Sequence, residues 1–133
     1  GLYPECPRRH ATRANIMKSG DQFHDTLHLT RVRREVSANE RAAFVAAAAA
    51  SLGELQQRYD SALAEARAQH RDMLESVANA HGHFNASLNR AQQALQDVRE
   101  ADVDDWYGYR EVHEAAVEQA HQSVRALEIL CRG

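Results

Sequence analysis

Apolar residues recur every three or four positions through the middle of this chain, from Val45 to Val98. At 100° per residue, this spacing places them along one face of an α-helix. Several of the bulky members, between Val45 and Leu95, project within roughly 60° of one another. The pattern predicts an all-α fold built on a long apolar seam. The members of the seam are Val45, Ala48, Leu52, Leu55, Tyr59, Ala62, Ala66, Met73, Val77, Ala80, Phe84, Leu88, Ala91, Leu95 and Val98.

The stretch "NAHGHFNAS" at residues 79–87 has the composition of a turn, because Asn and Gly lower helix stability. The seam nevertheless keeps its angular phase through this stretch, and Gly82 projects to the opposite side. We therefore expect one uninterrupted, coiled-coil-like helix from about residue 38 to residue 103, roughly 100 Å long. The alternative is a compact three- or four-helix bundle in which the chain bends near residues 79–85.

Shorter helices are expected to fold back on the long helix at each end. Pro4 and Pro7 favour an extended N-terminal arm over residues 1–19. A single helical domain is expected over residues 20–133, and a short helix over 20–36 is its first element.

The last helix is expected to begin near Trp106, because acidic residues favour a helix N-terminus and three aspartates precede this tryptophan. It should continue to about Cys131. Trp106, Tyr109 and His113 recur at helical spacing, and we expect them to form the apolar core of the corner between the two helices.

The two shorter helices, roughly 25 Å and 39 Å long, cannot together cover the long one. Bulky side chains are also sparse, since aromatic residues make up only 6% of the chain. The middle of the seam is therefore expected to stay bare, and an exposed apolar stripe of that length marks an interface. The expected interface residues are Leu55, Tyr59, Leu63, Met73 and Val77.

The chain has eight histidines, which could act as metal ligands, but the spacing of acidic residues around them does not favour a metal site. Di-metal helical bundles use two Glu-x-x-His pairs, and only Glu118 with His121 forms a good pair here. His70 and His113 project onto apolar faces, where a hydrogen-bonded histidine is more common than a ligand. No nucleophile motif, phosphate loop or dinucleotide fingerprint occurs. We expect no catalytic residue, no metal site and no cofactor.

Charge and hydropathy limit the partners. Residues 1–41 carry eight Arg or Lys against five Asp or Glu, while residues 42–133 carry eight against fourteen. Neither segment is basic enough to indicate nucleic-acid binding, and no apolar run has membrane-spanning length. Cys6 and Cys131 are expected to be free thiols, with an end-to-end disulfide as the alternative. The sequence does not indicate a compartment.

These patterns favour a non-enzymatic helical subunit that packs through its apolar seam, in a homo-oligomer or in a larger protein complex. One alternative is a small helical bundle that binds a metal or a ligand near His70 and His113. Another is a secreted helical effector or receptor fragment, tied by Cys6–Cys131 and glycosylated at Asn85 in "NAS".

Overall fold

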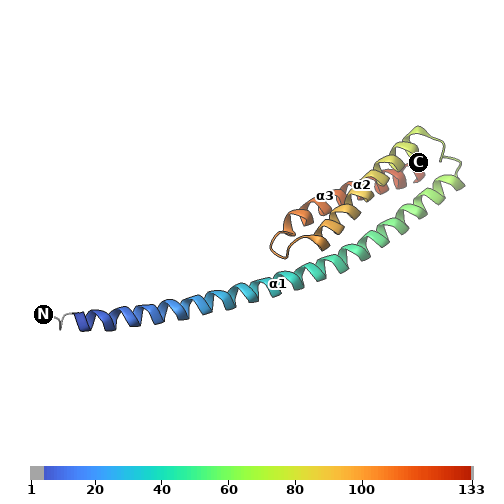
Figure 1. The fold of residues 1–133 in the computed structure, drawn as a ribbon. Helices are drawn as coiled ribbons and strands as arrows, with labels where there is room; N and C mark the ends of the chain where they lie inside the picture. Colours follow the sequence, from blue (N-terminus) through green and yellow to red (C-terminus); the bar gives the residue numbers. More distant parts are fainter. Residues whose placement is uncertain (1–4, 133) are drawn as a thin grey trace. The chain divides into compact units, whose positions relative to one another are not determined.

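The computed structural model describes the backbone of residues 5–132 and the side chains of residues 26–132. The described chain consists of three helices, α1 (Glu5–Ala68), α2 (Glu75–Glu100) and α3 (Tyr107–Arg132), shown in Figure 1. The expected all-α fold is confirmed. Within residues 5–132, none of the helices combines the length and the apolar character that a membrane span requires.

The chain divides into two compact units, an N-terminal unit (residues 1–38) and a helical bundle (residues 39–133). The N-terminal unit is helical from Glu5, although residues 1–19 were expected to be extended. Pro7 falls in the first turn of α1, where a backbone N–H has no partner within the helix and proline is tolerated. The division into an arm and a domain near residue 19 stays a prediction.

Helix α1 ends in a Schellman motif, and this is the first correction to the predicted fold. The N–H of Arg71 donates to Ala66 O (2.8 Å), and the N–H of His70 donates to Arg67 O (3.0 Å). His70 adopts the left-handed conformation that this motif requires, with φ 55°. The expected continuous helix over residues 38–103 is therefore interrupted between Ala68 and Glu75.

The alternative bend near residues 79–85 is also in the wrong place. Gly82 lies inside α2, and a Cβ added there would meet no atom within 4 Å. The chain does form a compact bundle, but it turns about ten residues earlier than the composition indicated.

The bundle buries the apolar seam against itself. Helices α2 and α3 lie antiparallel and side by side, and the part of α1 within the bundle runs along them (Figure 1). The expected bare stretch of the seam is therefore wrong, because the turn at residues 69–74 folds its second half over its first. The buried residues of this core are Leu55, Tyr59, Ala62, Ala66, Val77, Ala80, Phe84, Leu88, Ala120, Val124 and Leu127.

The corner between α2 and α3 is closed by an aromatic cluster. Trp106 is fully buried, with its ring 5.9 Å from Phe44 and 4.2 Å from Tyr107. Arg41 of α1 donates to the carbonyl oxygens of Val98 and Ala101, which lie at the C-terminal end of α2. These contacts satisfy carbonyl groups that have no partner inside the helix. The predicted position of the last helix is confirmed.

Candidate interaction surface

A groove of about 870 Å³ runs between α2 and α3. All of its lining residues belong to these two helices and none to α1, so the groove lies on a face of the hairpin that α1 does not cover. On each helix the lining residues recur at spacings of three and four, as one helical face requires. They are Ser76, Asn79, Ala80, His83, Ser87 and Arg90 of α2, and Gln119, Gln122, Ser123, Ala126, Ile129 and Leu130 of α3.

Small side chains form the floor of the groove. Ala80 and Ser87 of α2 are buried, and Ser123 of α3 is half-buried. Alanine and serine leave room between two packed helices that leucine would fill. On the α3 side, Ile129 is 64% exposed beside the exposed Ala126. The groove therefore presents apolar surface above a floor of small residues.

Arg90 supplies a guanidinium to the lining of the groove. Arg90 Nη2 donates to Gln119 Oε1 (2.6 Å) and to Ser87 Oγ (3.2 Å), which are both neutral acceptors. His83 adds an imidazole, and no carboxylate is found among the lining residues. Because both partners of the Arg90 guanidinium are neutral, its charge is not balanced by them. It can still donate hydrogen bonds to an acidic or carbonyl group of a bound partner.

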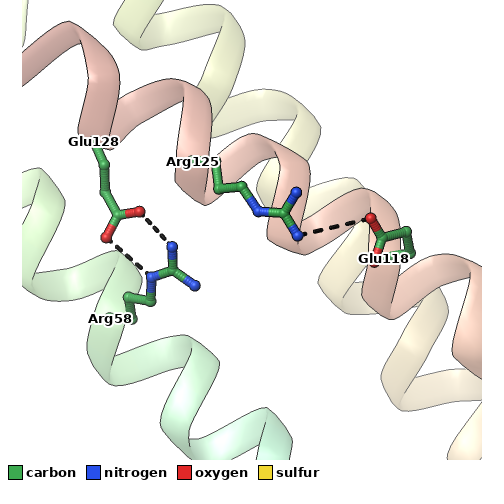
Figure 2. A network of polar contacts seen from close by, with 4 residues as sticks. All are labelled: Arg58, Glu118, Arg125 and Glu128. Carbon is green, nitrogen blue, oxygen red and sulfur yellow. Dashed lines mark hydrogen bonds and ion pairs between the residues drawn. The ribbon is translucent and has the colours of Figure 1, made fainter.

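An ion pair links α1 to α3. Arg58 makes a bidentate contact with Glu128, with distances of 2.9 Å and 2.5 Å (Figure 2). The hydrogen bond from Arg58 holds the pKa of the Glu128 carboxyl below its usual value. A second pair on α3, Arg125 with Glu118, is longer at 3.8 Å (Figure 2). The Arg58–Glu128 pair links α1 to α3, the Arg125–Glu118 pair lies within α3, and neither pair lines the groove.

The two histidines that were expected on apolar faces lie in different surroundings. His113 is buried, its Nδ1 donates to Ala91 O (2.7 Å), and its ring packs edge-on against Phe44. This confirms the predicted hydrogen-bonded seam histidine. His70 is exposed in the turn after α1, where Arg71 donates to the carbonyl of Leu130 near the end of α3. His70 and His113 therefore lie near opposite ends of α3 and do not share a site.

The described residues contain no group of three or more His, Cys, Asp or Glu side chains placed to hold a metal ion. Cys131 is a free thiol that donates to Ala62 O (3.4 Å). The side chain of Cys6 lies outside the described residues.

The structure separates the residues that were expected to form an interface. Leu55, Tyr59 and Val77 are buried in the core, and Leu63 packs against it. Met73 is 90% exposed, in the turn between α1 and α2. These residues were expected at an interface because the seam was expected to be bare, and in the structure the core of the bundle covers Leu55, Tyr59 and Val77.

The three residues that were expected in the core of the helix corner differ in their burial. Trp106 and His113 are buried as expected, whereas Tyr109 is 42% exposed. Tyr109 lies in the first turn of α3, where residues 107–110 are all exposed.

Sequence reasoning missed the groove. Its signal is a row of Ser and Ala on α2, at residues 76, 80 and 87, facing a similar row on α3 at 123 and 126. The two rows can be recognised as one surface only when the two helices are known to be neighbours.

No protein-family model, curated protein or solved structure matches this chain. The function must therefore be inferred from the geometry of the bundle and its groove.

Proposed function

We propose that this chain is a non-enzymatic helical interaction protein, and that the groove between α2 and α3 receives a helix from a protein partner. The observation that carries the proposal is the groove itself: α2 and α3 line it, α1 does not, and at Ala80 it borders the core that the three helices close. Ile129 is exposed at this groove, and an exposed apolar surface supports the binding of a partner.

A helix is the occupant whose shape suits this groove best. Two antiparallel helices leave between them a channel that a further helix fills in a four-helix bundle. Packed helices approach to about 8–10 Å between axes, and the smaller separations need small residues at the contact. Ala80, Ser87, Ser123 and Ala126 supply such residues along the groove.

The proposed chemistry of the partner follows from the lining. Apolar side chains of the occupant would lie over Ala126 and Ile129, and an acidic group near Arg90 would meet a guanidinium whose contacts are neutral. Helix-in-groove recognition of this kind depends on anchor residues at i, i+3 and i+7 of the bound helix.

The test compares two arginine substitutions of exposed alanines. Ala126→Arg places a long charged side chain in the groove, whereas Ala78→Arg places the same side chain on a face of α2 outside the groove. Tagged wild type and both variants are used to capture partners from cells, the proteins are identified, and each is purified and its affinity is measured. Circular dichroism confirms that the variants fold.

The proposal expects a purified partner that binds wild type and Ala78→Arg with similar affinity and binds Ala126→Arg at least roughly tenfold more weakly, a loss of about 1.4 kcal/mol. Partners that bind all three proteins equally well would show that the groove is not the docking site.

A further inference from the structure

The turn between α1 and α2 contains no residue that prevents a helix. Residues 69–74 read "QHRDML", without glycine, proline or a β-branched side chain. All six have ordinary helix propensities. The helix is interrupted where His70 takes a φ of 55°, a conformation that is unfavourable for a residue with a Cβ. With His70 in a right-handed conformation, α1 and α2 would join into one helix.

The apolar seam is in register for such a joined helix. Three pairs of buried residues, with one member on each side of the turn, are separated by 18 residues, which is five turns of an α-helix. The pairs are Tyr59 with Val77, Ala62 with Ala80, and Ala66 with Phe84. The two members of each pair would lie on one line along a joined helix. This register does not distinguish a hairpin from a continuous helix, so the same seam suits both.

Two exposed apolar side chains of the turn also suit the joined helix. Met73 is 90% exposed and Leu74 is 48% exposed. In a continuous helix both would project within roughly 60° of Tyr59, on the side of the seam. The hairpin leaves them in water, whereas a joined helix places them on the face that packs against other helices.

The face of α1 within the bundle already has a surface that matches it. Tyr59 stacks on Phe84 of α2 with their ring centroids 3.9 Å apart, and Arg58 pairs with Glu128 of α3. These contacts require that α1 lies against α2 and α3, and they are the same whichever copy of the chain supplies α1. A second copy is therefore the partner whose surface fits this face.

From these observations we propose that two copies of this chain exchange their α1 helices. In each copy α1 and α2 join through residues 69–74, and the part of α1 within the bundle packs against α2 and α3 of the other copy. Exchange of an identical element is a low-cost route to a closed dimer, and a short strained hinge favours it. The two hinges lie side by side near the twofold axis, so Met73 and Leu74 of each copy meet those of the other.

The exchange replaces contacts and does not remove them. The N–H groups of His70, Arg71 and Leu74, which donate within the turn, would donate to the carbonyl oxygen four residues earlier in the joined helix. Arg71 also donates to Leu130 O at the end of α3, and in the dimer α3 of the second copy covers that end of α1. The groove between α2 and α3 belongs to one copy in both arrangements, so this inference does not depend on the proposed function.

Two substitutions at one position of the hinge test the exchange. The N–H of Leu74 donates to Arg71 O (3.0 Å), and His70 is the only non-glycine residue with a positive φ in the described backbone. Residues 71–74 therefore form a type I turn with Asp72 at its first central position, where proline is favoured. Asp72→Pro keeps this turn and opposes a continuous helix, whereas Asp72→Ala favours the helix.

The full-length proteins are unfolded in urea, refolded over a wide range of protein concentration and analysed by sedimentation velocity. Wild type is expected to form a dimer whose share rises with concentration. The dimer of Asp72→Pro should be weaker at least roughly tenfold, and that of Asp72→Ala should be tighter. His70→Gly removes the penalty for a positive φ and should also weaken the dimer, which provides a second test of the hinge. Circular dichroism establishes that the helices are retained.

Reversal of the charges at the Arg58–Glu128 contact shows which copy supplies α1 (Figure 2). Arg58→Glu places two acidic groups at this contact within one chain, and Glu128→Arg places two basic groups there. When the two variants are refolded together, exchanged helices form two oppositely charged pairs, whereas chains that keep their own α1 retain both repulsions. The mixed dimer, identified by native mass spectrometry, should be at least roughly fivefold tighter than the dimer of either variant alone.

The Arg125–Glu118 pair provides the matched control, because both residues lie on α3 and stay in one chain in either arrangement. A mixture of Arg125→Glu with Glu118→Arg should show no preference for the mixed dimer. Three results would overturn the inference. They are a wild type that stays monomeric at every concentration, a dimer equally tight in Asp72→Ala, Asp72→Pro and His70→Gly, and a mixed dimer of Arg58→Glu with Glu128→Arg that is no tighter than the dimers of the single variants.

Discussion

The rings of Tyr59 and Phe84 stack face to face between α1 and α2, with their centroids 3.9 Å apart and their planes 3° from parallel. Both side chains are buried, at 3% and 0% exposure. The Tyr59 hydroxyl is also hydrogen-bonded to His81 Nδ1. One residue of α1 thus makes an apolar and a polar contact with α2, and together they fix how the two helices meet after the turn at residues 69–74.

Tyr59→Phe is expected to keep the stacked ring and lose the hydroxyl, which should lower the free energy of unfolding by about 0.5–1.5 kcal/mol at neutral pH. Burial raises the pKa of the Tyr59 phenol, so the folded state favours its neutral form. The stability that comes from keeping the Tyr59 phenol neutral is complete below the pKa of tyrosine in the unfolded chain, near 10. It is lost as the pH rises through the higher pKa of Tyr59 in the folded state. Urea unfolding at neutral and alkaline pH measures it.

The alkaline loss of stability should be smaller in Tyr59→Phe than in wild type. Tyr109→Phe, which removes a phenol hydroxyl from a side chain that is 42% exposed, is the matched control for the substitution itself. Equal alkaline slopes for wild type and Tyr59→Phe would contradict the prediction.

Tyr59 and Phe84 also show why the sequence predicted the wrong helix. Both residues project onto the same side of an imagined continuous helix, and in the structure they face each other across a hairpin. Each helix needs an apolar face of its own, and a hairpin requires only that the two faces meet. Angular agreement across residues 69–74 therefore contained no information about continuity. Helical class, apolar positions and the corner at Trp106 were predictable, because they depend on local spacing.

The amino-acid composition of residues 69–74 did not indicate a turn. The left-handed position of a Schellman motif is usually glycine, but here it is His70, and residues 69–74 contain neither glycine nor proline. Gly82 and its asparagine neighbours meanwhile suggested a turn inside α2. The groove could not be predicted either, since it exists only between two helices whose pairing depends on this turn.

His70→Gly is expected to raise the free energy of unfolding by about 1 kcal/mol, because glycine adopts a positive φ without the steric penalty of a side chain. His70→Ala keeps a Cβ at this position and should give no comparable gain. Thermal and urea unfolding of the three proteins measure the difference. A destabilised glycine variant would mean that the His70 side chain has a stabilising contact that outweighs its backbone strain.

Gly82→Ala should stabilise the chain by about 0.5–1 kcal/mol, because glycine is the less favourable residue in a helix interior. The new methyl group meets no atom within 4 Å. Gly53→Ala in α1 has the same open surroundings and serves as a parallel case, with a gain of the same sign. If the chain instead bent at Gly82, alanine there would lower stability while Gly53→Ala still raised it.

The Arg58–Glu128 pair is expected to contribute about 0.5–1 kcal/mol in a double-mutant cycle, since its side chains are 42% and 26% exposed and solvent screens them. Arg58 holds the pKa of Glu128 down, so this contribution is complete above the unfolded pKa, near 4.3. It is lost as the pH falls through the lower folded pKa. Cycles with Arg58→Met and Glu128→Gln at neutral and acidic pH measure it.

The longer and more exposed pair of Arg125 and Glu118 is the matched control for that cycle, and its coupling should be close to zero. A coupling between Arg58 and Glu128 that persisted at acidic pH would show that packing of the side-chain stems, and not charge, links α1 to α3.

Trp106→Ala is expected to be the most damaging single change at the α2–α3 corner. The ring is fully buried against Phe44 and Tyr107, so its removal leaves a cavity and should cost about 3–5 kcal/mol. Tyr109→Ala removes a ring that is 42% exposed from the first turn of α3 and should cost much less. Denaturant unfolding of the two variants compares them directly, and similar losses would mean that Tyr109 contributes to the corner in a way that its exposure does not indicate. Since α2 and α3 form both walls of the groove, Trp106→Ala should also weaken any binding there, whereas Tyr109→Ala should leave it intact.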